Sequence, residues 1–183
     1  MINNDIIQQG KEGEDAFQTW LNSEELGFLR IDQDWKSMSS VFKESVKRPD
    51  YLLLLPSIGF IAIDVKHSSL NSSCFTLTID NELERTIAFE HYTRIYLWYA
   101  YKDKDYSGNS IWHFISAHKA LEKGIKKRNQ KKNISYFSIK LKYFERVTKS
   151  EDLSKLFNSR IGLLGKFTRA IEHSLSSIKS SDG

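Results

Sequence analysis

The chain has 183 residues, of which 40% are hydrophobic and 27% charged, with a net charge of +4, and this composition is typical of one globular domain. A single cysteine excludes a disulfide framework and a cysteine-rich zinc site, which fits a reducing compartment. No apolar run approaches the ~20 residues of a membrane-spanning helix, and the polar, acidic N-terminus does not resemble a signal peptide. We therefore expect a soluble, cytoplasmic protein with no membrane partner.

The first part of the chain predicts a helix followed by strands. Hydrophobic residues at helical spacing indicate a helix over 10–26, and Gly27 ends it. Runs of alternating or continuous hydrophobic residues predict strands, of which the second and third are joined by the turn at 56–59. In chain order, these strands are expected at 28–33, 50–55, 60–67 and 74–80.

The second part predicts a long helix, two more strands and two closing helices. A stripe of hydrophobic and aromatic residues indicates a helix over 83–102. Strands are expected at 110–117 and 134–147, and helices at about 150–158 and 161–178. We infer an α/β fold in a single domain over 1–183, with a mixed central sheet flanked by helices and a C-terminal helical extension. Its core would span about 10–117, and 118–183 would supply the basic strand and the C-terminal helices.

The charge is unevenly placed along this chain. Residues 1–35 carry two basic and eight acidic side chains, whereas residues 119–149 carry eleven basic and two acidic ones, interleaved with aromatic residues. A basic block of this kind suits contact with the phosphate backbone of nucleic acid. The alternative is a solvated, lysine-rich loop. The expected contact residues are Lys126, Lys127, Arg128, Lys131 and Lys132.

The predicted hairpin over 50–67 contains three charged residues, Asp50, Asp64 and Lys66, in an otherwise hydrophobic stretch. Side chains alternate along a strand, so Asp64 and Lys66 point to the same face, one pleat apart. In an antiparallel hairpin, Asp50 lies roughly across from them. Buried charges are costly unless they are paired or hold a cation. We expect the two carboxylates and the ammonium to converge at one end of the hairpin.

Oxygen ligands at short range suit a hard divalent cation, and Mg²⁺ usually takes one or two carboxylates. Asp50 and Asp64 are the expected ligands, with the main-chain carbonyl of Val65 as a third. Such an ion polarises a phosphoryl group and generates hydroxide near neutral pH. Lys66 beside it would orient the attacking water or stabilise negative charge in the transition state. Mn²⁺ is the expected substitute for Mg²⁺.

The motif formed by these residues resembles that of the PD-(D/E)XK nuclease superfamily. It reads Pro49-Asp50, thirteen intervening residues, and Asp64-Val65-Lys66. The resemblance implies a restriction-endonuclease-like fold, whose core is a helix, a three-stranded meander, a second helix and a further strand, and residues 10–117 match that order. It also implies a metal-dependent nuclease that hydrolyses phosphodiester bonds in DNA, as an endonuclease.

The superfamily commonly places an acidic residue on its first helix, and Glu14 fits this position. Glu14 shares the inward stripe of Phe17 and Leu21, where an acidic side chain needs a partner. It therefore joins Asp50, Asp64 and Lys66 as an expected catalytic residue and is an expected metal ligand. Similar nucleases often use a polar residue of the second helix to contact phosphate, and Arg94 is the candidate for this contact.

Several alternatives stay open. A buried salt bridge of Lys66 with either aspartate would explain the charges of the hairpin, but it explains neither Glu14 nor the second carboxylate. A second function is a nuclease-like fold without catalysis, which binds nucleic acid or a partner protein. A third is a toxin or effector nuclease that cleaves RNA. Cutting both strands of DNA from one site per chain would need two chains, which points to a homodimer.

Overall fold

The computed structural model describes residues 4–32, 39, 45–56, 58–67, 70–79, 82–103, 111–130 and 133–157. The chain divides into two compact units, residues 1–148 and 149–183. In the second unit, the 3₁₀ helix η3 spans Ser150–Leu153 and residues 154–157 are α-helical, while the remainder of the predicted C-terminal helices lies outside the described residues. The prediction of a single domain stays a prediction. All other elements belong to the first unit.

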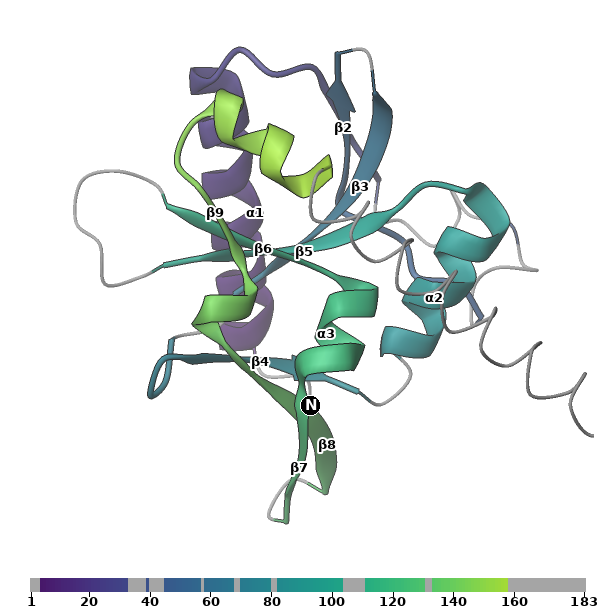
Figure 1. Ribbon diagram of the computed structural model, residues 1–183, viewed down its shortest axis with the longest axis vertical. Coiled ribbons are helices and arrows are strands. Elements are labelled where there is room, and N and C mark those ends of the chain that lie inside the picture. Colours follow the sequence, from purple (N-terminus) through teal and green to yellow (C-terminus); the bar gives the residue numbers. More distant parts are fainter. Residues whose placement is uncertain are drawn as a thin grey trace, which may run out of the picture. The chain divides into compact units, whose positions relative to one another are not determined.

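A mixed six-stranded sheet forms the centre of the first unit (Figure 1). β3 and β5 pair in parallel, and the other neighbouring strands pair antiparallel. The strands lie in the order β1-β2-β3-β5-β6-β9, with bounds Phe28–Arg30, Tyr51–Leu55, Gly59–Lys66, Leu97–Lys102, Trp112–Ser116 and Glu145–Val147.

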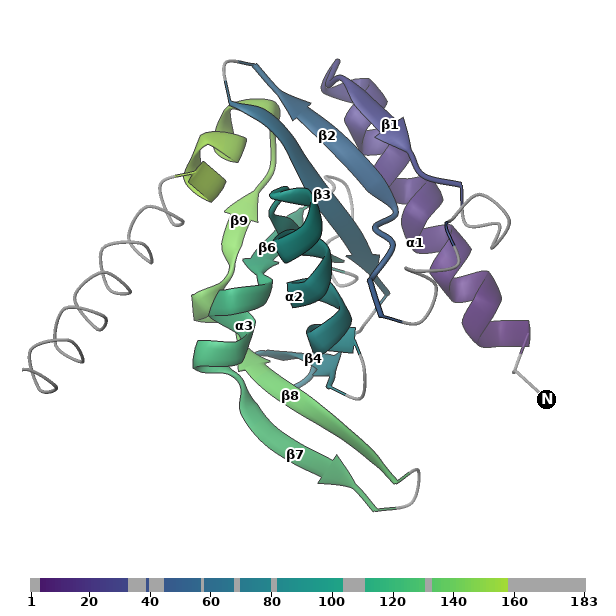
Figure 2. The ribbon, with the colours of Figure 1, turned by 90° about the vertical axis from the view of Figure 1, so that its right-hand side faces the viewer.

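Helices cover both faces of this sheet (Figure 2). On one face lies α1, Asn4–Ser23, whose Phe17 is fully buried and packs edge-on against Trp112 of β6, with 4.7 Å between ring centroids. On the other face lie α2, Glu82–Thr93, and α3, Ala117–Lys123, which enclose a hydrophobic core with β3 and β5. The predicted α/β class, a mixed sheet flanked by helices, is confirmed.

A second, three-stranded antiparallel sheet closes this core. Its strands lie in the order β4-β8-β7, with bounds Cys74–Thr78, Ile134–Lys140 and Ile125–Asn129. Phe75 and Leu77 of β4 and Phe137 and Ile139 of β8 belong to the same core as the tyrosines of β5. The 3₁₀ helix η2, Leu141–Tyr143, then connects β8 to β9.

The expected core order is present as α1, the meander β1-β2-β3, α2 and β5. The third strand of the meander is Phe28–Arg30, because the strand at Cys74–Thr78 leaves the main sheet and pairs with β8. Ser72 and Ser73 have positive φ angles of 49° and 59°, so the chain reverses at this point. That reversal directs β4 away from β3.

The long helix predicted over 83–102 is wrong. The helix α2 ends at Thr93, and residues 97–102 form β5. Arg94 has a φ of 60°, and the Thr93 hydroxyl accepts a hydrogen bond from the Ile95 amide at 3.1 Å, which together end the helix. β5 is buried on both faces, so its aromatic and apolar run lacks the alternation that marks a half-exposed strand.

Two further differences concern the C-terminal half of the first unit. The single strand predicted over 134–147 is interrupted by η2, so it becomes β8 and β9, which belong to different sheets. The helix α3 and the strand β7 were not predicted, since a short helix and a strongly basic strand carry little hydrophobic pattern. Within the residues that the structure describes, no helix is long and apolar enough to span a membrane.

Candidate active site

The β2–β3 hairpin positions the charged residues of the motif at its open end, opposite its turn. Asp50 precedes β2, and its amide donates to the Ile63 carbonyl at 2.9 Å. Because Tyr51 pairs with Ile63, the antiparallel register sets Asp50 across from Asp64. The Asp50 carboxylate also accepts a hydrogen bond from the Val65 amide at 2.7 Å. The motif residues are therefore neighbours because of strand pairing, although thirteen residues separate the two aspartates in sequence.

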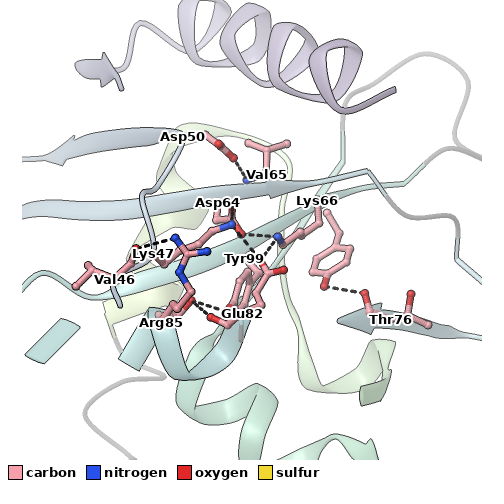
Figure 3. Close-up of polar contacts among 12 residues, drawn as sticks. Val46, Lys47, Asp50, Asp64, Val65, Lys66, Thr76, Glu82, Arg85 and Tyr99 are labelled. Carbon is pink, nitrogen blue, oxygen red and sulfur yellow. Dashed lines mark hydrogen bonds and ion pairs between the residues drawn. The ribbon is translucent and has the colours of Figure 1, made fainter. Parts of the chain in front are cut away.

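The two aspartates lie on different sides of β3 (Figure 3). Asp50 lies between β3 and α1, whereas Asp64 and Lys66 point to the opposite face, toward α2. The Lys66 ammonium lies 2.6 Å from Asp64 Oδ2 in an ion pair. This buried oxygen accepts no hydrogen bond of regular geometry. Asp64 is only 3% exposed, so this ion pair is largely shielded from water.

Lys47 and Glu82 complete a cluster of four charges around Asp64, which we call the lysine–carboxylate cluster (Lys47, Asp64, Lys66, Glu82). The Lys47 ammonium lies 3.2 Å from Asp64 Oδ1 and 3.2 Å from Glu82 Oε1. Lys66 also contacts Glu82 Oε1. Two ammonium groups thus face two carboxylates, and the charges balance, which is what burial of ionised groups requires.

Neighbouring backbone and side chains hold this cluster in place. The Lys47 amide donates to the Arg85 carbonyl at 2.8 Å, and the Arg85 guanidinium donates to the Val46 carbonyl at 3.1 Å, so the loop carrying Lys47 is bound to α2. The Thr86 and Tyr99 hydroxyls lie 2.8 Å apart in a hydrogen bond, and Tyr99 is the register partner of Asp64. The first turn of α2 is therefore fixed relative to β3.

Burial and neighbouring charges separate the pKa values of the two aspartates. Burial by itself would raise the pKa of Asp64, but the charges of Lys66 and Lys47 outweigh it and lower this pKa to about 2. The pKa of Asp50 is raised to about 8, first by burial and then by the charges of Asp64 and Glu14, which the Val65 amide and Lys47 only partly offset. Of these two aspartates, Asp50 is therefore the one whose ionised form is less stabilised by its surroundings.

Glu14 lies close enough to Asp50 to affect its pKa, but its direct partner is on β1. The Glu14 carboxylate pairs with the Arg30 guanidinium at 3.0 Å, and its main-chain carbonyl accepts a hydrogen bond from the Tyr51 hydroxyl at 2.9 Å. Its side chain is about a quarter exposed, at 24%. Glu14 therefore sits at the edge of the hairpin end and not within the lysine–carboxylate cluster.

A pocket of about 440 Å³ gives access to this end of β3. It lies between α1 and the chain that follows β3 and β5, and it is lined by Glu12, Gly13, Ala16, Lys66, His67, Lys102 and Asp103. Lys66 therefore borders both the buried cluster and an open pocket. His67, which follows the motif lysine, also lies in this pocket and close to Gly13 of α1.

The predicted nucleic-acid contacts lie apart from the cluster. Lys126, Lys127 and Arg128 form an exposed strand, β7, and not the loop that was the alternative, while Lys131 and Lys132 lie outside the described residues. Arg94 is exposed beyond the C-terminal end of α2, roughly 18 Å along the helix axis from Glu82 at its N-terminal end. The structure therefore does not bring Arg94 to the site.

Sequence reasoning missed Lys47 and Glu82, the two partners of Asp64 that lie outside the hairpin. Lys47 stands three residues before Asp50 in a connecting loop, and Glu82 opens a helix, where an acidic residue is common for its interaction with the helix dipole. Neither position follows the alternation of the strands. Only the packing of α2 and this loop against β3 makes them members of the cluster.

The described residues contain no group of three or more His, Cys, Asp or Glu side chains placed to hold a metal ion. The oxygens available at the hairpin end are those of Asp50 and Asp64, with the carboxylate of Glu14 at its edge. This number of carboxylates suits an ion that retains several waters, as Mg²⁺ does.

No protein-family model matches the chain, and a search of curated proteins gives no match either. Among solved structures, the chain is similar to Hjc, a Holliday junction resolvase from the archaeal hyperthermophile Archaeoglobus fulgidus. The two share 15% sequence identity, with a TM-score of 0.45, and the alignment covers 74% of this chain and 87% of Hjc.

Proposed function

We propose that this protein is a metal-dependent nuclease that hydrolyses phosphodiester bonds in DNA, as an endonuclease. The observation that supports this function is the open end of the β2–β3 hairpin. There, strand register sets Asp50 across from Asp64, and Lys66 contacts Asp64 beside an open pocket. Asp50 on one side of β3, Asp64 on the other and a fixed ammonium beside an open pocket are the kinds of group that metal-assisted phosphodiester hydrolysis uses.

Asp50 and Asp64 are the residues that would hold a divalent metal ion, with the Val65 carbonyl and Glu14 as the other proposed ligands. The donor set fits Mg²⁺, or Mn²⁺ in its place, because these ions prefer oxygen ligands and one or two carboxylates suffice. A cation next to Asp50 would also offset the cost of its buried negative charge, which raises its pKa to about 8. When bound, such an ion polarises a phosphoryl oxygen and lowers the pKa of a bound water.

Lys66 would act as a fixed positive charge and not as a proton acceptor. Burial alone would lower its pKa, but Asp64 and Glu82 raise it well above the ordinary value, so the ammonium stays protonated near neutral pH. A protonated lysine cannot serve as general base. Its proposed task is to stabilise the negative charge that develops on the phosphoryl group, and Glu82 positions it for this task.

The substrate would be held by basic side chains away from the cluster. Lys126, Lys127 and Arg128 on β7 are the proposed phosphate contacts, together with Lys131, Lys132 and Arg94 from the sequence prediction. A double-strand cut from one proposed site per chain would require two chains, and a homodimer is part of this proposal. The unpaired Cys74 agrees with a protein of the reducing cytoplasm.

A second candidate function is a nuclease-like fold that binds DNA without cutting it. It is favoured by the ion pairs of Asp64, because both of its carboxylate oxygens face lysines. In that case the lysine–carboxylate cluster would stabilise the fold, and the basic strand would carry the function.

A cleavage assay on duplex, single-stranded and branched DNA in Mg²⁺ or Mn²⁺ tests the proposal. Asp64→Asn should lower the cleavage rate at least about a hundredfold, the order of magnitude lost with one electrostatic partner of the transition state. Asp152→Asn, a matched change in the second unit, should leave the rate unchanged. Full activity of Asp64→Asn would rule out the assigned site. A wild-type protein that binds DNA but cuts none of these substrates would support the binding function instead.

A further inference from the structure

We propose that the β4-β8-β7 sheet is the surface that reads duplex DNA, with the tip of the β7–β8 hairpin in the major groove. This inference rests on the proposed function for the class of its substrate, but it concerns binding and not chemistry. It is carried by the shape of the hairpin, by the charge of its strands and by their connection to the end of β3.

The β7–β8 hairpin extends beyond the sheet to which it belongs (Figure 2). The last rung of β4 pairs Thr78 with Tyr136, and Tyr136 in turn pairs with Lys127 of β7. Ile79, just after β4, still donates to the Ser135 carbonyl at 3.0 Å, and beyond Ser135 the strands β7 and β8 continue through the pair Asn129–Ile134. The major groove is ~8.5 Å deep and admits a two-stranded ribbon, which is the form of this hairpin.

The two faces of this sheet differ in chemistry. Phe75, Leu77, Phe137 and Ile139 point into the hydrophobic core. By strand alternation and register, the opposite face carries hydroxyl, amide and ammonium groups, from Thr76, Thr78, Lys127, Asn129, Tyr136 and Lys140, beside the exposed Ile125 and Ile134. The two threonines, Asn129 and both lysines on this face are exposed. Hydroxyl, amide and ammonium groups are donors to phosphate oxygens.

The charges of the sheet favour a polyanionic partner. Its three strands carry Lys126, Lys127, Arg128 and Lys140 and no acidic residue. All five residues of β7 are exposed. Lysine on an edge strand also prevents that strand from pairing with other chains. This role explains neither Lys140, which lies on the middle strand β8, nor the run of three cations on β7. Arg128 and Asn129, next to the turn, are of the residue types that bond guanine and adenine edges in the major groove.

The sheet is attached directly to the proposed active site. The Tyr101 hydroxyl donates to the Thr76 carbonyl of β4 at 3.1 Å, and Tyr101 is the register partner of Lys66. Figure 2 shows the hairpin extending from the end of the first unit at which β3 ends. A duplex bound by the hairpin would therefore pass close to the pocket that borders Lys66.

The binding test compares two triple variants in the Asp64→Asn background, without divalent metal, so that cleavage does not interfere. Lys126→Gln/Lys127→Gln/Arg128→Gln removes three charges from β7, and Lys11→Gln/Lys149→Gln/Lys155→Gln removes three exposed charges elsewhere. Fluorescence anisotropy with a labelled duplex over a range of salt concentrations gives the affinity. The β7 variant should bind at least about tenfold more weakly and lose about 2 to 3 from its log–log salt slope, since each phosphate contact contributes about 0.9. The control should lose far less.

The groove is tested by methylation of guanine N7, an atom of the major groove, with dimethyl sulfate. The Asp64→Asn protein should protect guanines within its binding site, and the β7 variant should not protect them at concentrations that saturate the duplex. Three outcomes would overturn the proposal. They are equal affinity and equal salt slope for the two triple variants, binding of the duplex without N7 protection, and tighter binding to single-stranded than to duplex DNA. A wild-type protein that protects N7 but cuts no DNA would contradict the proposed nuclease function and support this DNA-binding surface. A wild-type protein that cuts DNA, with a β7 variant that binds DNA normally, would support the nuclease function and contradict this surface.

Discussion

At the end of β3, the Glu82 carboxylate contacts the ammonium groups of both Lys47 and Lys66, which also face Asp64. The arrangement keeps two lysines charged at a position that is largely closed to water. Its stability depends on balance, because removing one partner of a buried ion pair leaves a charge without compensation. Glu82 should therefore matter for stability as well as for the position of Lys66.

Glu82→Gln is expected to lower the free energy of unfolding by about 2 kcal/mol, the cost of leaving a charged hydrogen-bonding group without its partner. Glu84→Gln, an exposed position of the same helix, should change it by less than about 0.5 kcal/mol. Urea denaturation of the metal-free proteins measures both. Equal stability of the two variants would show that the Glu82 contacts contribute little to the fold.

At the scale of elements, Gly124 fixes how α3 joins the hairpin. It ends α3, and its amide donates to the Ala120 carbonyl at 2.9 Å. A Cβ atom at this position would lie 2.6 Å from the Ala120 carbonyl oxygen and 2.7 Å from the ring of Phe137. A side chain here would thus push apart the helix and β8. Close packing, and not an unusual backbone angle, accounts for this glycine, whose φ is −72°.

Gly124→Ala should therefore destabilise the protein by about 1 to 3 kcal/mol, as overpacked core positions do. Gly10→Ala is the matched control, because nothing lies within 4 Å of a Cβ atom at this position in α1. There the substitution should be neutral or stabilise the helix, by up to about 1 kcal/mol. Thermal unfolding followed by circular dichroism tests both variants. A Gly124→Ala protein as stable as wild type would mean that α3 and β8 are not packed as described.

For the whole molecule, the raised pKa of Asp50 makes stability depend on pH. An acid whose pKa moves from 3.8 in the unfolded chain to about 8 in the folded protein keeps its proton on folding between these values. The folded state then binds more protons than the unfolded state, so the free energy of unfolding falls as the pH rises through this window. Asp64 acts in the opposite direction and at lower pH, because its folded pKa is about 2.

Metal-free Asp50→Asn should gain stability relative to wild type as the pH is raised from 5 to 8. The gain should reach at most about 1.4 kcal/mol per pH unit, the value of one proton. Taking the difference between the two proteins removes the contributions of the histidines, which both share. Urea denaturation at several pH values measures it, with Asp32→Asn, an exposed position, as the control. A difference that does not change with pH would show that Asp50 titrates normally.

The sequence by itself determined that Asp50, Asp64 and Lys66 lie at one end of the same hairpin, because strand register sets Asp50 across from Asp64. Strand alternation and the position of a short turn are local properties, and they predict which side chains share a rung or a face. The mixed sheet flanked by helices followed from the same local patterns. The position of the helix-borne Glu14 was local too, but its partner, Arg30, was not predicted.

Only the tertiary structure decided which residues from other elements surround the hairpin. Lys47 and Glu82 reach Asp64 because a loop and the first turn of α2 pack against β3, which no periodicity records. The strand β5 was predicted as part of a helix because it is buried on both faces. A strand enclosed in this way has hydrophobic residues at nearly every position and lacks the alternation that identifies a half-exposed strand. The side of β3 on which Asp50 lies was likewise decided by its bond to the Val65 amide, because a carboxylate at a strand end satisfies the nearest donor that folding leaves available.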